Sequence, residues 1–212
     1  MTEEVVIIGG RGNGTVIASV IEDCAKNGQD ISVVGFLNDH EKEVNGYPVL
    51  GSILNSNWRS LSPDFKFIFS LSNIKMARDR YGILEEMEIP VNRFCTVVHP
   101  TAVVAGNSQL GNGVVIMPHV VIGPNVVIGN HSQLYAQSFV GHDTTLDEMV
   151  FVANNASIGG RIKIAKGAHV GSNSSLVERL KIGEFSIIGL GSVVLDDVED
   201  GKTAVGNPAR VL

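Results

Sequence analysis

An aliphatic residue recurs at every sixth position from Val98 to Val194, and this period constrains the fold more than any other feature. The residue directly after it is Gly in eight repeats, and the residue four positions after it is usually small or β-branched. The series has no insertion and comprises Val98, Val104, Leu110, Ile116, Ile122, Ile128, Leu134, Val140, Leu146, Val152, Ile158, Ile164, Val170, Leu176, Ile182, Ile188 and Val194. Such regularity is typical of a repeat fold, in which each repeat contacts only its neighbours.

Three six-residue segments can close one turn of a triangular coil, so that residues eighteen apart stack on one another. We expect the aliphatic residue of each repeat to point into a narrow prism. The small residue should lie near a corner, where Gly or another residue that tolerates positive φ is favoured. Leu180 is the one misfit among the small positions, and no aromatic residue after Val98 occupies an inward aliphatic position. The period predicts a left-handed parallel β-helix of hexapeptide repeats over residues 98–212, with a short C-terminal tail.

Residues 1–97 follow the different pattern of an α/β domain. Val5–Ile8 is wholly apolar, as expected of a buried parallel strand, and it leads into a Gly-rich turn and a helical pattern that reaches about residue 27. Further strands are expected over 31–37, 65–71 and 94–98, and a helix over 76–87. Strand, Gly-rich turn, helix and strand in this order predict a Rossmann-like domain, with ligands beyond the carboxyl ends of the strands.

Composition excludes several other classes of protein. The formal net charge of -6 disfavours nucleic-acid binding, and a hydrophobic content of 44% disfavours disorder. The acidic start is unlike a signal peptide, and no stretch approaches the ~20 apolar residues that span a membrane. Cys24 and Cys95 lack the spacing of a disulfide framework or a zinc site. We therefore expect a cytoplasmic protein without a metal.

Short motifs along the whole chain resemble those of one family. They are Val6-Ile7-Ile8-Gly9-Gly10-Arg11-Gly12-Asn13-Gly14, Gly35-Phe36-Leu37-Asn38-Asp39, Gly46-Tyr47-Pro48-Val49-Leu50-Gly51, His99-Pro100-Thr101-Ala102, Val140-Gly141-His142-Asp143 and Gly206-Asn207-Pro208-Ala209-Arg210. Together they are similar to the motifs of the two-domain sugar acetyltransferases of the PglD/NeuD type. The resemblance implies an acyltransferase that takes acetyl-CoA as donor and a nucleotide sugar as substrate for glycan biosynthesis, and that has active sites between subunits.

Acetyl transfer needs a base for the attacking group and donors for the thioester oxyanion. Of the five histidines after Val98, only His142 is followed directly by a carboxylate, and an imidazole is suited to accept a proton near neutral pH. The resemblance implies that His142 is the general base, that Asp143 orients it, and that the Gly160 backbone N–H binds the oxyanion. Adjacent residues on a β-coil normally point to opposite sides, so the spacing alone does not predict contact between His142 and Asp143.

The resemblance also implies two binding regions. Acetyl-CoA is expected along the later coils, at Gly171, Ser172, Gly189 and Gly191. The nucleotide sugar is expected at Gly9, Gly10, Arg11, Gly12, Asn13, Gly14, Asn38, Asp39 and Tyr135. A Gly-rich turn at a helix N-terminus can seat a diphosphate, and Asp39 ends a strand where it could bind a ribose or uracil edge. Asn13, Tyr135 and Phe151 replace residues that are common in the family, and Tyr135 and Phe151 flank His142 in the sequence.

Several functions stay open. The leading hypothesis is N-acetylation of a nucleotide-linked amino sugar. The alternative is O-acetylation of a sugar such as sialic acid. A third hypothesis is a non-catalytic trimer that binds a nucleotide sugar. A carbonic anhydrase of the γ type needs three converging histidines, but His119, His131 and His142 do not share the eighteen-residue spacing. The aliphatic residues Val115, Val121 and Val127 are expected on exposed faces, which favours a C3 homotrimer.

Overall fold

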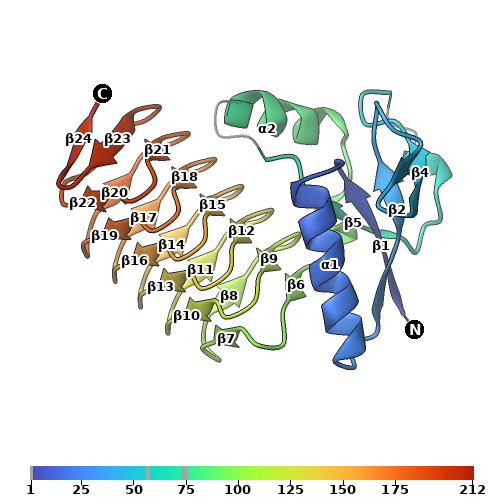
Figure 1. Ribbon diagram of the computed structural model, residues 1–212, viewed down its shortest axis with the longest axis horizontal. Helices are drawn as coiled ribbons and strands as arrows, with labels where there is room; N and C mark the ends of the chain where they lie inside the picture. Colours follow the sequence, from blue (N-terminus) through green and yellow to red (C-terminus); the bar gives the residue numbers. More distant parts are fainter. Residues whose placement is uncertain (1, 56–57, 73–75) are drawn as a thin grey trace. The chain divides into compact units, whose positions relative to one another are not determined.

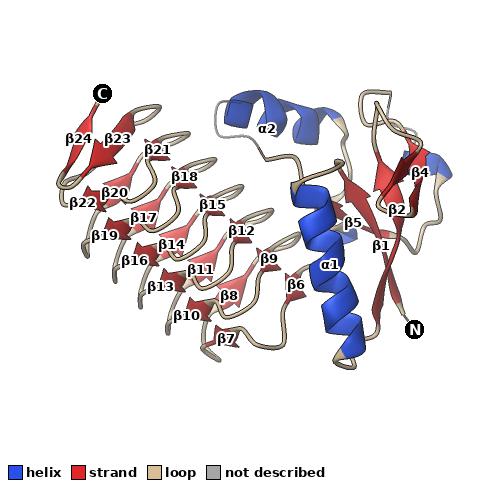
Figure 2. Ribbon diagram, in the orientation of Figure 1, coloured by secondary structure: helices blue, strands red, loops and turns tan. Residues whose placement is uncertain are grey.

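The computed structural model describes residues 2–55, 58–72 and 76–212 and divides into two compact units, Met1–Pro100 and Thr101–Leu212 (Figure 1). The first unit contains a small sheet with two helices. The second unit consists of short parallel strands in repeating coils (Figure 2).

The sheet of the first unit has the strand order β3-β4-β2-β1-β5. Strand β1 pairs in parallel with β2 and β5, and its residues Val5–Ile8 are fully buried, which explains their continuous apolar run. The bounds are β1 (Glu3–Ile8), α1 (Asn13–Lys26), β2 (Ile31–Leu37), β3 (Glu43–Val44), β4 (Tyr47–Gly51), β5 (Lys66–Phe69) and α2 (Ala77–Glu86), with 3-10 turns at Trp58–Ser60 and Val91–Arg93. This is the expected α/β arrangement.

Two details of the first unit differ from the sequence-based expectations. The hairpin of β3 and β4 was not predicted, and its second strand extends the sheet beside β2. The strand expected over 94–98 is reduced to β6 (Val97–Val98), because a 3-10 turn at Val91–Arg93 precedes it and Phe94 makes only an isolated bridge to Phe67.

The second unit is built on three sheets in which the parallel strands of successive coils are eighteen residues apart; Val121, for example, pairs with Phe139. At the C-terminal end β21 pairs with β23 at a spacing of sixteen residues, and β23 and β24 are antiparallel. The β13 sheet contains β7 (Val103–Val104), β10 (Val121–Ile122), β13 (Phe139–Val140), β16 (Ser157–Ile158), β19 (Ser175–Leu176) and β22 (Val193–Val194). The β14 sheet contains β8 (Gln109–Leu110), β11 (Val127–Ile128), β14 (Thr145–Leu146), β17 (Lys163–Ile164) and β20 (Lys181–Ile182). Within the second unit, the β12 sheet contains β9 (Val115–Ile116), β12 (Gln133–Leu134), β15 (Phe151–Val152), β18 (His169–Val170), β21 (Ile187–Ile188), β23 (Thr203–Gly206) and β24 (Ala209–Val211). The predicted left-handed parallel β-helix is confirmed.

Two positions of each repeat point into the coil, not one. From Ile116 onward the aliphatic residues are buried as predicted, whereas Val98, Val104 and Leu110 are only half-buried. From Val114 onward the small or β-branched residue four positions later is buried as well and does not lie at the corner. Polar members of this second set bond to the backbone; Ser132 Oγ donates to the carbonyl of Asp147 at 2.9 Å and Thr144 Oγ1 to that of Gly159 at 3.0 Å. Leu180 is also buried, so the apparent misfit is a larger residue inside the coil.

The glycine of the repeat has a different role from the one expected. Positive φ falls three residues after the aliphatic position, mostly on other residue types such as Asn125 and Asp143, with φ of 59° and 58°. The repeat glycine is needed because the coils approach closely there: a Cβ on Gly141 would lie 2.7 Å from the Gly159 carbonyl carbon, and one on Gly129 would lie 2.6 Å from that of Asp147. Coil spacing, and not turn conformation, therefore explains the repeated glycine.

The outward faces carry apolar side chains in places. Val103, Val121, Val127 and Phe139 are exposed, whereas Val115, expected on an exposed face, is buried. No helix within the described ranges is long and apolar enough to cross a membrane. Cys24 and Cys95 are free and buried thiols.

Candidate active site

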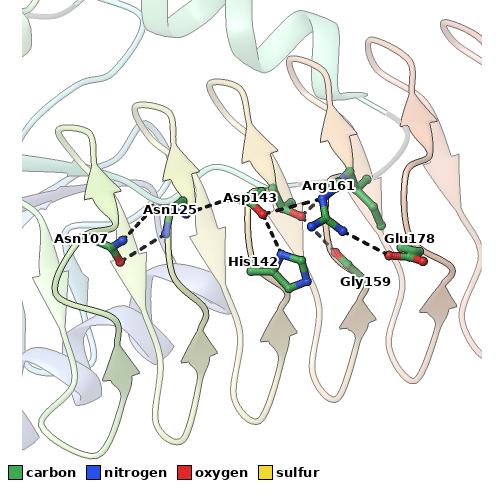
Figure 3. A network of polar contacts seen from close by, with 9 residues as sticks. Asn107, Asn125, His142, Asp143, Gly159, Arg161 and Glu178 are labelled. Atoms are coloured by element: carbon green, nitrogen blue, oxygen red, sulfur yellow. Dashed lines mark hydrogen bonds and ion pairs between the residues drawn. The ribbon is translucent and has the colours of Figure 1, made fainter.

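His142 and Asp143 lie at the corner between the β13 and β14 sheets and contact each other directly. His142 Nδ1 and Asp143 Oδ2 are 2.7 Å apart (Figure 3). The strand alternation that disfavours such contact does not hold here, because Asp143 adopts a left-handed conformation with φ of 58°. Both side chains are partly exposed, at 45% and 39%, so the pair is open to a ligand.

A column of polar side chains runs through this corner at intervals of eighteen residues. Asn107 Nδ2 donates to Asn125 Oδ1 at 2.6 Å, and Asn125 Nδ2 donates to Asp143 Oδ1 at 2.9 Å. Hydrogen bonds from His142 and then Asn125, with the charge of Arg161, hold the pKa of Asp143 below its usual range. The two asparagines are absent from the sequence-based site, although the eighteen-residue register could have identified them.

Cationic and acidic side chains extend the column on its other side. Arg161 Nε lies 3.8 Å from Asp143 Oδ2, and Arg161 Nη1 lies 3.7 Å from Glu178 Oε2 (Figure 3). Arg179 Nη1 contacts the other oxygen of Glu178 at 3.7 Å. These distances describe loose, partly exposed ion pairs, so Arg161 is a minor influence on Asp143 compared with the direct hydrogen bonds.

Gly160, the predicted oxyanion residue, lies against the His142 imidazole. A Cβ on Gly160 would be 2.9 Å from His142 Nε2. Its φ is not positive, so the glycine is explained by the nearby ring and not by a left-handed corner. Within the described ranges, no group accepts a hydrogen bond from the Gly160 backbone N–H, which leaves this donor beside the His142 ring.

The residues predicted to bind acetyl-CoA lie at a different corner of the coil. Gly171, Ser172, Gly189 and Gly191 lie between the β12 and β13 sheets, as does Tyr135. Gly171 and Gly189 are also required by packing, since a Cβ would lie 2.6 Å from the Leu190 nitrogen and from Val205 Cγ1, respectively. Within one chain, the structure therefore does not bring these residues together with His142.

Aromatic rings form a ladder along the β12 sheet. Tyr135 lies 4.7 Å from Phe151 between ring centroids, and Phe151 stacks on His169 at 4.8 Å with an interplanar angle of 4°. Burial raises the pKa of Tyr135 to about 12 and lowers that of His169 to about 4, so both are neutral at pH 7. Tyr135 and Phe151 thus flank His142 in the sequence but contact each other at the neighbouring corner.

A groove with a volume of about 640 Å³ lies on the β14 sheet, which follows the His142 corner. Its lining includes Lys163 and Lys181, which pair one coil apart, and the acidic residues Asp197, Glu199 and Asp200. The sequence motifs do not predict this groove, because its walls come from segments that are up to 55 residues apart, Thr145 to Asp200.

In the first unit, the Gly-rich turn is closed around Asn38 and Ser70. A Cβ on Gly9 would overlap Ser70 Oγ at 2.0 Å, and one on Gly10 would lie 2.5 Å from Asn38 Nδ2. Asn38 Nδ2 donates to the Gly9 carbonyl at 3.0 Å, and its Oδ1 accepts from the backbone of His40 and Glu41. Asn38 therefore holds the turn, and Ser70 is a neighbour that the sequence analysis missed.

The remaining residues of this unit that were predicted to bind the nucleotide sugar differ in burial and in their hydrogen-bond partners. Gly12 has φ of 85° and precedes α1, which begins at Asn13; Gly14 is buried against the Phe36 ring. Arg11 pairs with Glu41 at 2.9 Å and stays 77% exposed. Asp39 Oδ1 accepts hydrogen bonds from Ser52 Oγ and from the backbone N–H groups of Ile53 and Leu54. One oxygen of Asp39 is thus used to hold the 52–54 turn.

Histidine, cysteine and acidic side chains are scattered over the described parts of the chain and do not gather into a metal site. In residues 2–55, 58–72 and 76–212, no group of three His, Cys, Asp or Glu side chains could hold a metal ion. Burial lowers the pKa of His131 to about 4, and His131 lies at the corner between the β14 and β12 sheets, away from that of His142.

Two family models match the chain. Residues 4–81 match the PglD N-terminal domain, and residues 107–142 match the bacterial transferase hexapeptide model of six repeats. In sequence, the chain is 27% identical over 81 residues to an acyl-[acyl-carrier-protein]–UDP-N-acetylglucosamine O-acyltransferase of Pseudomonas savastanoi pv. phaseolicola. That match covers 38% of the chain, which spans only about a third (31%) of the curated relative.

Several solved structures are similar to this chain over its whole length. The acetyltransferase domain of PglB from Neisseria gonorrhoeae FA1090, in complex with acetyl coenzyme A, is 28% identical with a TM-score of 0.85 and 100% of both chains covered. A histidine-to-asparagine mutant of perosamine N-acetyltransferase from Caulobacter crescentus, in complex with CoA and GDP-perosamine, is 26% identical with a TM-score of 0.83, covering 100% of this chain and 98% of that one. WeeI from Acinetobacter baumannii AYE is 26% identical with a TM-score of 0.82, and both chains are fully covered.

Proposed function

The chain joins a PglD N-terminal domain to bacterial transferase hexapeptide repeats, as its resemblance to the PglD/NeuD-type sugar acetyltransferases implied, and we propose on this basis that it is an acetyl-CoA-dependent sugar acetyltransferase. Its acceptor is the amine of a nucleotide-linked amino sugar. The observation that carries the proposal is the 2.7 Å contact of His142 with Asp143 at an open corner, beside the Gly160 N–H, which has no acceptor among the described residues.

The proposed reaction is a direct attack on the thioester. The amine nitrogen of the sugar bonds to the acetyl carbonyl carbon while His142 Nε2 accepts the proton that the amine loses. Asp143 stabilises the imidazolium that forms, and the Gly160 N–H donates to the developing oxyanion. When the intermediate collapses, the carbon–sulfur bond breaks and coenzyme A leaves as a thiolate, which receives the proton from His142.

Substrate binding divides between the two units. The turn at residues 9–14, with Asn38 and Asp39, is proposed to hold the nucleotide, as the GDP-perosamine complex of the Caulobacter relative suggests by analogy. Acetyl-CoA is proposed to lie along the later coils at Gly171, Ser172, Gly189 and Gly191. Because these residues and Tyr135 occupy a different corner from His142, a complete site needs the corner of a second subunit.

A homotrimer supplies that second corner and covers the exposed apolar residues Val103, Val121 and Phe139 of the β13 sheet. We expect light scattering of the full chain at micromolar concentration to give three times the monomer mass of 22.6 kDa. A monomer that still transfers acetyl groups would contradict both the trimer and the shared site.

The acceptor is tested by measuring coenzyme A release with UDP-, GDP- and dTDP-amino sugars and with free sialic acid. We expect release with at least one nucleotide-linked amino sugar and none when its amine is already acetylated. Release with sialic acid alone would favour O-acetylation; the Pseudomonas relative is itself named an O-acyltransferase. Binding of a nucleotide sugar without any release would favour the non-catalytic module.

A further inference from the structure

We propose that Asn107 and Asn125 are positioning residues, whose side-chain amides orient the Asp143 carboxylate and thereby set which nitrogen of His142 is the base. The proposal rests on the proposed function, which makes His142 the general base. The three side chains follow one another in successive coils at the His142 corner (Figure 3).

The backbone N–H of Asn125 fixes which atom of each amide in this column donates and which accepts. The backbone N–H of Asn125 can only donate, and it donates to Asn107 Oδ1 at 3.3 Å. Asn107 therefore presents its Nδ2, which donates to Asn125 Oδ1 at 2.6 Å. With its oxygen accepting, Asn125 must present Nδ2 to the next coil, where it donates to Asp143 Oδ1 at 2.9 Å.

The column ends on the imidazole. Because Asn125 holds Oδ1 of Asp143, the other oxygen, Oδ2, faces His142 Nδ1 at 2.7 Å. An ionised carboxylate only accepts, so Nδ1 carries the proton and Nε2 has the free electron pair. Nε2 is the ring atom nearest the position of a Gly160 Cβ, beside the predicted oxyanion donor. The amides thus act on the reacting nitrogen through Asp143.

The first test replaces Asn125 with Ala and reads the His142 tautomer directly. Long-range ¹H–¹⁵N spectra of the full-length, histidine-labelled protein at pH 7.5 should show Nδ1–H in the wild type and a mixture of both tautomers in Asn125→Ala. We expect kcat to fall about tenfold with KM values within twofold, because the base is misaligned and not lost. An unchanged tautomer together with an unchanged kcat would overturn the proposal.

Asn155→Ala is the matched control for the backbone. Asn155 is an exposed corner asparagine with φ of 57°, close to the 59° of Asn125, but it lies at the other corner, between the β12 and β13 sheets. Both substitutions should lower the thermal midpoint by a similar amount, because Ala tolerates positive φ less well than Asn. Only Asn125→Ala should change the His142 tautomer, and an equal change in both variants would overturn the proposal.

The second test uses pH. Asn125→Asp places a second carboxylate against Asp143. While both are ionised they repel each other, so Asp143 turns away from His142; when the two carboxyl groups share a proton, the repulsion is relieved. The charged and titratable groups around Asp143 are His142, Arg161 and, beyond Arg161, Glu178. Once protonated, the introduced carboxyl group would again donate to Asp143 Oδ1, so the kcat of the variant relative to the wild type should rise as the pH falls from 8 to 6. A pH-independent ratio would overturn the proposal. If the wild type transfers no acetyl group, the proposed function fails, and the tautomer spectra still decide the positioning role.

Discussion

Replacing His142 with Gln should reduce kcat for acetyl transfer by about 10²–10⁴-fold, the range expected when a general base is removed. Gln has no group that accepts a proton at neutral pH, so the amine must lose its proton to water. The loss should appear in kcat/KM to the same extent, because the base acts in the transition state and does not hold the ground-state substrates. Coenzyme A release, followed with a thiol reagent over a range of acceptor concentrations, measures both constants.

His119→Gln is the matched control. His119 is an exposed corner histidine of the same β-helix with φ of 60°, but its position falls between the β12 and β13 sheets, and it has no carboxylate neighbour in sequence. This variant should keep the wild-type rate. Transfer that persists undiminished in His142→Gln, with the far-UV circular dichroism of both variants unchanged, would contradict the assignment of the base.

Gly160→Ala should lower kcat by about a hundredfold without unfolding the protein. The new methyl group would lie 2.9 Å from His142 Nε2 and 3.0 Å from Cε1, which is closer than Cβ contacts normally come. The obstacle is a partly exposed side chain and not the backbone, so the imidazole can move away at little cost in stability. A displacement of ~1 Å at a reacting group costs about a hundredfold in rate. Steady-state kinetics and the thermal midpoint separate the two effects.

Gly106→Ala provides the comparison, because a Cβ at Gly106 has no atom within 4 Å and its φ is not positive. This variant should match the wild type in both rate and thermal midpoint. A wild-type kcat in Gly160→Ala would mean that the imidazole does not occupy the position described or that the reacting nitrogen faces elsewhere.

The aliphatic period predicted the coil and its eighteen-residue register correctly. It did not predict correctly which position of each repeat forms the corner. The spacing alone predicts that residues eighteen apart pair, as Val121 and Phe139 do. It does not say which of the six positions turns the corner, because that depends on φ. Gly141 and its equivalents therefore looked like corner residues, although they are required by the close approach of the next coil.

Some residues of the candidate site were predicted from the sequence and others were not, and each outcome has a physical explanation. His142, Asp143 and Gly160 came from a local motif and its resemblance to a family, and the structure brings the three together. Asn125 and Arg161 belong to other coils and were missed, although the register would have identified them as neighbours of Asp143. Lys163 and Lys181 were also missed, because the groove they line forms only when distant segments fold together.

The amino-acid sequence by itself determined the coil and its eighteen-residue register, because an aliphatic residue at every sixth position can be buried along one axis when three segments close each turn. Only the tertiary structure decided that His142 and Asp143 meet. Neighbouring side chains on a regular strand diverge, and here a left-handed residue with φ of 58° reverses that divergence. The same fold places an amide from the preceding coil on the far oxygen of the carboxylate, a contact between residues eighteen positions apart.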